Sequence, residues 1–231
     1  MFSVYTSPTS VFARIKEKPL WILPVVLAIV ANMAVSLVSL RYVDWAQARQ
    51  VAMDSMRQRN MTEDQISQAM ERMDQFQSNP LMRYGFPLVG AFFTSVVSVF
   101  FLALIYNVSL PLLGAAGNFM RTLSVIAVSG LVSIPGAIVR IVLILLKKSA
   151  DVSTSLLVAA PGLKSGFLAV ILSRVDLFAI WQLILAGLGL KVVFDIRGSK
   201  SWWLVFSIWG VLTLVMALLG GASRGGVTIG R

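Results

Sequence analysis

The fold of this chain is indicated most clearly by residues 172–190, LSRVDLFAIWQLILAGLGL. A charged pair, Arg174 and Asp176, precedes an apolar run of the kind that enters a lipid bilayer. Within the run, Gly187 and Gly189 are small enough to let a second backbone come close. This arrangement is typical of a transmembrane helix with charged residues at its mouth.

The composition of the whole chain repeats this pattern. Of the 231 residues, 57% are hydrophobic and only 13% are charged, and the mean hydropathy is +0.82. A soluble domain is about half apolar and about a quarter charged. Because the apolar residues fall in long uncharged blocks, we predict an all-α fold, a polytopic membrane helix bundle formed by one domain over residues 1–231.

Five blocks are long enough to cross the hydrocarbon core, which takes about 20 residues of helix. An amphipathic helical hairpin at residues 44–79 is expected outside the membrane between the first two spans, and the glycine-rich residues 220–231 are expected to form a flexible tail. Before the first span, Val11, Phe12 and Ile15 share one face and predict a short helix lying on the membrane surface, the alternative being an unstructured basic tail. The predicted spans are approximately residues 20–40, 86–110, 122–146, 176–194 and 202–219.

The hairpin has a well-defined helix start at Thr62-Glu-Asp-Gln65, a capping box in which the threonine and glutamine side chains satisfy backbone donors. Its two helices carry apolar stripes rich in methionine, a side chain that repacks easily. The stripes are either an adaptable partner-binding surface, or faces that bury against each other or the bilayer. The residues of this candidate partner surface are Met53, Met56, Ile66, Met70, Met73 and Phe76.

Pro135 and Arg140 are unusual residues inside the third predicted span. Pro135 removes one backbone hydrogen bond and kinks the helix, which membrane helices tolerate where neighbours satisfy the freed carbonyl group. An arginine in a membrane segment is by default a candidate functional residue. Because Lys147 and Lys148 follow about two turns later, the Arg140 side chain can instead extend to the same interface or pair with a carboxylate.

The fourth predicted span begins with residues that also have a structural interpretation. An aspartate such as Asp176 in the first turn complements the helix dipole, and Arg174 is expected to neutralise it. Trp181 is expected to serve in packing or in the interfacial aromatic belt. Small residues should let the fourth and fifth helices pack closely, or support self-association. They are Ala186, Gly187, Gly189 and Gly210.

The chain has neither cysteine nor histidine, which excludes disulfides, thiolate nucleophiles and the commonest general base and metal ligand. The candidate acids Asp151, Asp176 and Asp195 lie at the edges of spans, and none has a second carboxylate at motif spacing. We therefore expect no catalytic, cofactor-binding or metal-binding residues, and we predict that the protein is not an enzyme.

The formal net charge of +10 bears on the partners of the chain. In a soluble protein this charge would suggest nucleic acid, but here the basic residues flank apolar blocks. Attraction to anionic lipid headgroups is the simpler explanation, and we expect no nucleic-acid partner.

Four pieces of sequence occur in an order shared with a known family. They are IKEKPLW at residues 15–21, LGAAGNF at residues 113–119, residues 125–135, and VDLFAIW at residues 175–181 leading into Gly187 and Gly189. With these pieces the chain resembles the Yip-domain family (Ypt-interacting-protein type multi-pass membrane proteins), particularly its bacterial members. The resemblance implies five helical spans with the amino terminus in the cytoplasm, and we expect a multi-pass protein of the bacterial inner (plasma) membrane.

In eukaryotic relatives the resemblance implies binding to small GTPases of vesicle traffic and assembly with other Yip-type proteins. The Asp-Leu-Tyr-Gly-Pro-type element of that branch is absent here, and the methionine-rich hairpin departs from the family pattern. For bacterial members no settled activity is implied.

The distribution of positive charge favours the opposite orientation. With the amino terminus inside, most basic residues would lie outside, including the six arginines of residues 41–83. We retain the orientation of the family as the expectation.

Two functions fit these features. The first is a non-enzymatic scaffold or adaptor that recruits membrane-protein partners through the hairpin or organises lipid through its basic rims. The alternative is a small transporter or channel, in which the kink at Pro135 breaks a helix and Arg140 and Asp176 form a gated pair.

Overall fold

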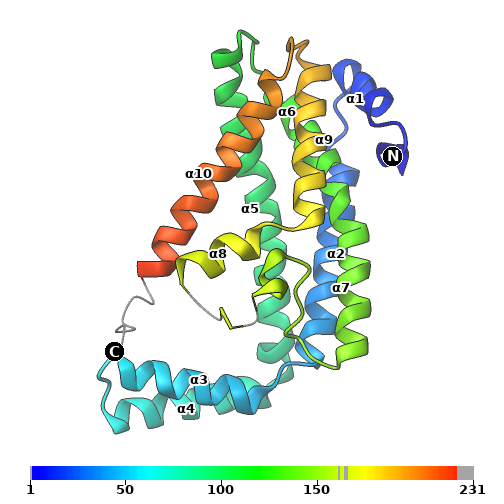
Figure 1. Cartoon of the computed structure of the whole chain (residues 1–231). Helices are drawn as coiled ribbons and strands as arrows, with labels where there is room; N and C mark the ends of the chain where they lie inside the picture. Colours follow the sequence, from blue (N-terminus) through cyan, green and yellow to red (C-terminus); the bar gives the residue numbers. More distant parts are fainter. Residues whose placement is uncertain (1, 161, 164–165, 223–231) are drawn as a thin grey trace. The chain divides into compact units, whose positions relative to one another are not determined.

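The computed structural model describes residues 2–160, 162–163 and 166–222, which form helices joined by short turns (Figure 1). No strand occurs among these residues, and an isolated bridge pairs Ser155 with Asp176. The predicted all-α fold is therefore confirmed. Residues 220–222 of the predicted tail belong to the last helix, and residues 223–231 lie outside the described part of the chain.

Within the described residues, four stretches of helix are long and apolar enough to cross a membrane. They are α2 (Ile22–Arg41), the stretch around α5 (Phe86–Ser109), the pair α6 (Phe119–Ser129) and α7 (Ser133–Lys147), and α10 (Lys200–Ala222). A π-helical turn, Leu81–Gly85, precedes α5, and a 3-10 turn, Leu110–Leu113, follows it. Another 3-10 turn, Gly130–Val132, joins α6 to α7.

The fourth predicted span corresponds to α9 (Leu177–Val193), which has 17 residues and is shorter than those four stretches. At 1.5 Å per residue it is roughly 26 Å long, slightly less than the hydrocarbon core of about 30 Å. A bilayer accommodates such a difference by thinning locally. The number of spans is therefore four by length, and five if α9 also crosses.

The chain forms two compact units. The first unit contains Met1–Ala28, Val96–Gly136 and Ser153–Arg231, and the second contains Ile29–Ser95 and Ala137–Val152. The main cluster of buried apolar side chains lies in the first unit.

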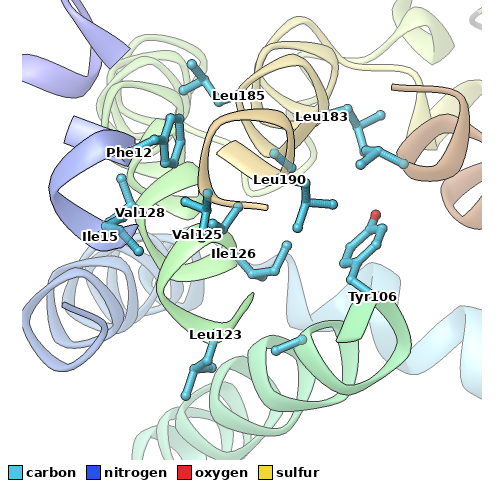
Figure 2. Close-up of a cluster of buried hydrophobic side chains, with 14 of the residues drawn as sticks. Phe12, Ile15, Tyr106, Leu123, Val125, Ile126, Val128, Leu183, Leu185 and Leu190 are labelled. Carbon is cyan, nitrogen blue, oxygen red and sulfur yellow. The ribbon is translucent and has the colours of Figure 1, made fainter. Parts of the chain in front are cut away.

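Helix α9 is the centre of the first unit. α1 (Pro8–Glu17), α6 and α10 all pack against it (Figure 1). It is apolar on all sides, as expected for a helix surrounded by other helices or by lipid. Figure 2 shows Leu190 of α9 among side chains of the surrounding helices, including Phe12 of α1, Ile126 of α6 and Tyr106 of α5. The buried residues of α9 are Leu183, Leu185, Ala186, Gly187, Gly189, Leu190 and Val193.

The position of α1 differs from the expectation of a helix whose apolar face rests on the membrane surface. Its Phe12 and Ile15 are only 0% and 1% exposed, because α6 and α9 cover that face. Gly189 leaves the space that Phe12 occupies, so the helix has a fitted protein surface available. A matched solid surface gives more dispersion contact than mobile lipid chains do.

The second unit contains the predicted hairpin, formed by α3 (Trp45–Gln58) and α4 (Glu63–Ser78). The predicted capping box is present, because Thr62 Oγ1 accepts from the Gln65 amide and Gln65 Oε1 accepts from the Thr62 amide. An ion pair of 3.1 Å joins Arg49 of α3 to Asp74 of α4. The hairpin is therefore closed by both local capping and cross-helix contacts.

Contacts within the first unit determine how often the chain crosses. Lys16 forms an ion pair with Asp195, so these residues lie at the same end of the unit. Residues at one end must be separated by an even number of crossings. Between them lie α2, the stretch around α5, the α6–α7 pair and α9; if the first three cross, α9 must also cross.

We therefore predict five crossings, which single cysteines can test because the chain has none of its own. Cysteine variants at the exposed residues Ala116, Ser199 and Ser67 are labelled in intact cells with a membrane-impermeant maleimide. Ala116 and Ser199 should be labelled from the same side, and Ser67 in the hairpin from the other. Labelling of Ser199 together with Ser67 would show that α9 does not cross.

Candidate functional site

Asp176 closes the start of α9. Its Oδ1 atom accepts from the backbone amides of Phe178, at 2.8 Å, and Ala179, at 3.3 Å. Its Oδ2 atom accepts from the Thr154 hydroxyl. The Leu156 amide also donates to the Val175 carbonyl, at 2.9 Å. Both carboxylate oxygens are therefore used to cap the helix and to hold the preceding loop, which is a structural role.

Arg174 does not neutralise Asp176 as expected, because no ion pair joins them in the described part of the chain. Arg174 ends α8 (Phe167–Arg174), and the extended backbone of Val175 separates it from α9. The Arg174 guanidinium instead lies 2.9 Å from the Met216 sulfur of α10. The charged pair of the sequence thus belongs to two different helices with two different neighbours.

Two other singled-out side chains have separate surroundings. Arg140 is exposed on α7, in the second unit. Trp181 is half-buried in the first unit, with its ring centroid 5.7 Å from that of Tyr5. Tyr5 belongs to the amino-terminal segment, whose contact with α9 no motif predicted.

The glycines of α9 contact different helices. A Cβ atom at Gly187 would overlap Trp202 of α10, whose indole Nε1 donates to the Ile184 carbonyl at 3.2 Å. A Cβ atom at Gly189 would instead lie 2.6 Å from Val125 Cγ1 and 2.7 Å from Phe12 Cε1. Gly187 therefore serves the expected contact between α9 and α10, whereas Gly189 serves the contacts with α1 and α6.

The fifth helix does not use its own glycine in this way. A Cβ atom at Gly210 would have no neighbour within 4 Å. Gly210 therefore does not have the expected role in close packing between α9 and α10.

Pro135 lies in the first turn of α7, directly after the 3-10 turn Gly130–Val132. Having no N–H group, it cannot donate to the Leu131 carbonyl four residues earlier. The Tyr5 hydroxyl donates to this carbonyl at 2.6 Å. Burial raises the pKa of Tyr5 above its ordinary value of 10.0. The hydroxyl is protonated at neutral pH and can donate. The amino-terminal segment thus adds a hydrogen bond at the 3-10 turn that joins α6 to α7.

A polar hollow at one end of the first unit was not predicted. It has a volume of about 200 Å³ and lies between the α5–α6 turn and the α9–α10 turn. Only weak signals in the sequence pointed to it, a glycine-rich reversal and a short charged turn separated by some 80 residues of chain. Its lining residues are Leu113, Gly114, Ala115, Phe194, Asp195, Ile196, Arg197 and Lys200.

The methionine-rich stripes of the hairpin are turned largely inward. Ile66 and Met70 are buried, at 3% and 5% exposure. Met53, Met56, Met73 and Phe76 are half-buried, and the Phe76 ring lies 6.3 Å from that of Phe86. The side chains of the candidate partner surface are thus buried or half-buried in the second unit. The charged faces of the hairpin are the exposed ones.

The described residues contain no group of three or more acidic, histidine or cysteine side chains that could hold a metal ion. The polar side chains described above cap helices, hold loops or line the hollow.

Comparison with known proteins gives one match. The family model described as the Yip1 domain matches residues 2–219. No curated protein and no solved structure matches this chain.

The different surroundings of Gly189 and Gly210 predict different effects on stability when each is replaced by alanine. Gly189→Ala should destabilise the protein by about 1–3 kcal/mol, because the added methyl group overlaps Phe12 and Val125. Gly210→Ala is the matched control and should be neutral, or stabilising by up to about 1 kcal/mol through helix propensity. Thermal unfolding in a mild detergent measures both, and equal effects would contradict the assigned contact.

The contact between Tyr5 and the kink can be tested by a double-mutant cycle. Tyr5→Phe should cost about 1–2 kcal/mol, since it removes the donor to the Leu131 carbonyl. In a Pro135→Ala background the cost should shrink, because the alanine amide can donate to the same carbonyl. Equal costs of Tyr5→Phe in the two backgrounds, measured by thermal unfolding, would show that the hydroxyl does not compensate for the proline.

Proposed function

Since this chain belongs to the Yip1-domain family, we propose that it is a non-enzymatic scaffold or adaptor, which recruits protein partners through its hairpin and holds anionic lipid at its basic rim. The family match and the four long apolar stretches of helix in the described residues indicate an integral membrane protein. We place it in the bacterial inner membrane, with the hairpin outside the bilayer.

The observation that carries the adaptor role is the closed hairpin of the second unit. Its methionine-rich stripes are turned largely inward, and Ile66 and Met70 are buried without a partner. Its outer faces carry exposed charged side chains that take part in none of the ion pairs formed by the described residues. Charges of both signs on a rigid helical surface favour selective, reversible protein contacts. The exposed charged side chains of the hairpin that form no such ion pair include Asp54, Arg59, Glu71 and Arg72.

A hollow beside the first helix of the hairpin adds to this surface. It has a volume of about 410 Å³ and lies between the start of α3 and residues 149–151. Val51 is 61% exposed at its edge, and Asp44 and Asp151 are among its lining residues. An apolar contact flanked by carboxylates favours a partner segment that carries an apolar side chain and a positive charge.

The lipid role rests on the basic side chains near the ends of the helices. Arg14 and Lys18 are exposed at the end of α1. Arg197 is exposed in the α9–α10 turn, and Lys200 is exposed at the start of α10. Trp203 is 72% exposed in the first turn of α10, and tryptophan is enriched at the level of lipid headgroups. Basic residues beside such a belt attract anionic headgroups.

The transporter alternative has less support from the same residues. Both carboxylate oxygens of Asp176 are engaged in capping and loop contacts, so a gating role would require breaking them. Arg140 has an exposed side chain, which suits extension toward an interface.

The adaptor role predicts that partners depend on the outer face of the hairpin. Arg59→Glu combined with Arg72→Glu should reduce partner recovery at least about tenfold, since reversed rim charges repel the matching surface. The full-length tagged protein is purified in mild detergent, and co-purifying proteins are quantified by mass spectrometry. Replacement of residues 44–79 by a Gly/Ser linker should remove the same proteins.

Arg14→Glu combined with Lys18→Glu is the matched control, since it reverses two exposed charges at the end of α1, which belongs to the first unit and not to the hairpin. It should leave recovery unchanged. Partners that persist in both hairpin variants would overturn the adaptor role. Circular dichroism of each variant confirms that the helices remain folded.

A further inference from the structure

The polar hollow of the first unit brings together two turns that are far apart in the sequence. Gly114 and Ala115 come from the α5–α6 turn, Arg197 comes from the α9–α10 turn, and Lys200 begins α10. Its volume of about 200 Å³ would hold roughly six water molecules, so a small polar group fits without displacing protein. Gly114 has a φ of +77°, a left-handed conformation that allows the tight turn on one side of the hollow.

The charges around the hollow leave a positive excess. Asp195 is the one acidic residue that lines it, and its carboxylate is paired with Lys16 of α1. Arg197 and Lys200 form no ion pair within the described residues. Two cationic side chains therefore face a recess whose carboxylate is already compensated.

Residue types common at the level of lipid phosphates come close to the hollow in the chain. Trp202 and Trp203 come shortly after Lys200 in the chain, and Lys191 places its ammonium group 5.2 Å from the centre of the Trp202 ring. Tryptophan and lysine at the end of an apolar helix are typical of the membrane–water interface. The open side of the recess is therefore available to a headgroup from the adjoining leaflet.

We propose that this hollow is a binding site for a phosphate group, supplied by the headgroup of an anionic phospholipid. The Arg197 guanidinium can donate two parallel hydrogen bonds to phosphate oxygens, and Lys200 contributes a point charge. The proposal deepens the lipid part of the proposed function and is independent of the hairpin. One discrete phosphate site differs from a general attraction of anionic lipid to basic residues.

The test measures the thermal unfolding midpoint of the full-length protein in a neutral maltoside detergent. Short-chain phosphatidylglycerol, short-chain phosphatidylcholine and inorganic phosphate are titrated in separate arms, and each apparent Kd follows from the rise in the midpoint. Phosphatidylglycerol should stabilise the protein most. Equal potency of inorganic phosphate would retain the phosphate site and assign it to the soluble anion.

Paired variants locate the effect. Arg197→Gln combined with Lys200→Gln should weaken phosphatidylglycerol binding at least about tenfold, through loss of two charged donors. Lys147→Gln combined with Lys148→Gln removes the same charge from exposed positions at the end of α7 that do not line the hollow, and should change binding less than about threefold. Asp195→Asn should tighten binding, because it removes the lining carboxylate and frees Lys16, and asparagine tolerates the φ of 52° at this position.

Three results would overturn the site. They are the absence of stabilisation in every arm, equal losses in the two paired variants, and weaker binding by a folded Asp195→Asn variant. Equal losses would leave a general lipid attraction in place while removing the discrete site. The recovery of partners through the hairpin is measured separately, so failure here does not decide the adaptor role.

Discussion

The absence of a side chain at Gly189 is the constraint on which the first unit depends. Phe12 and Val125 occupy the volume that a Cβ atom would need, so α1 and α6 can approach α9 on the same side. Docking of α1 then has two consequences at a distance from the glycine. It brings the Tyr5 hydroxyl to the Leu131 carbonyl and Lys16 to Asp195. The absence of a side chain at Gly189 thus allows the packing of α1 that places Tyr5 at the Leu131 carbonyl and Lys16 at Asp195.

Backbone polar groups explain why segments outside the long helices are ordered. In a bilayer a carbonyl or amide without a partner costs several kcal/mol, since no water can replace the missing hydrogen bond. Tyr5, from the segment before α1, donates to the carbonyl that Pro135 cannot serve. Asp176 accepts from the first amides of α9 and is itself held by Thr154 from the preceding loop. These loops supply hydrogen bonds at the points where the helices begin or change to a 3-10 turn.

Local patterns predicted the helical fold, because hydrophobic runs and the capping box at Thr62 depend on neighbouring residues alone. The same patterns led to the wrong neighbours for side chains whose partners are remote. Gly189 meets α1 and α6, and Arg174 lies beside Met216 because the chain turns at Val175. The polar hollow was missed for a related reason. Arg197 and Gly114 have no spacing that links them, and only the return of α9 brings their turns together.

The charged side chains of the two units have different surroundings. In the first unit the cations stand beside a recess and a tryptophan belt, where a lipid phosphate can replace their hydration. In the second unit charges of both signs cover a hairpin that is already closed on its apolar faces, so binding there need not be accompanied by folding. Since Arg197 and Arg72 belong to separately packed units, substitution of either should leave the local packing of the other unchanged. The proposed lipid capture and the proposed partner recruitment are therefore separable by mutation.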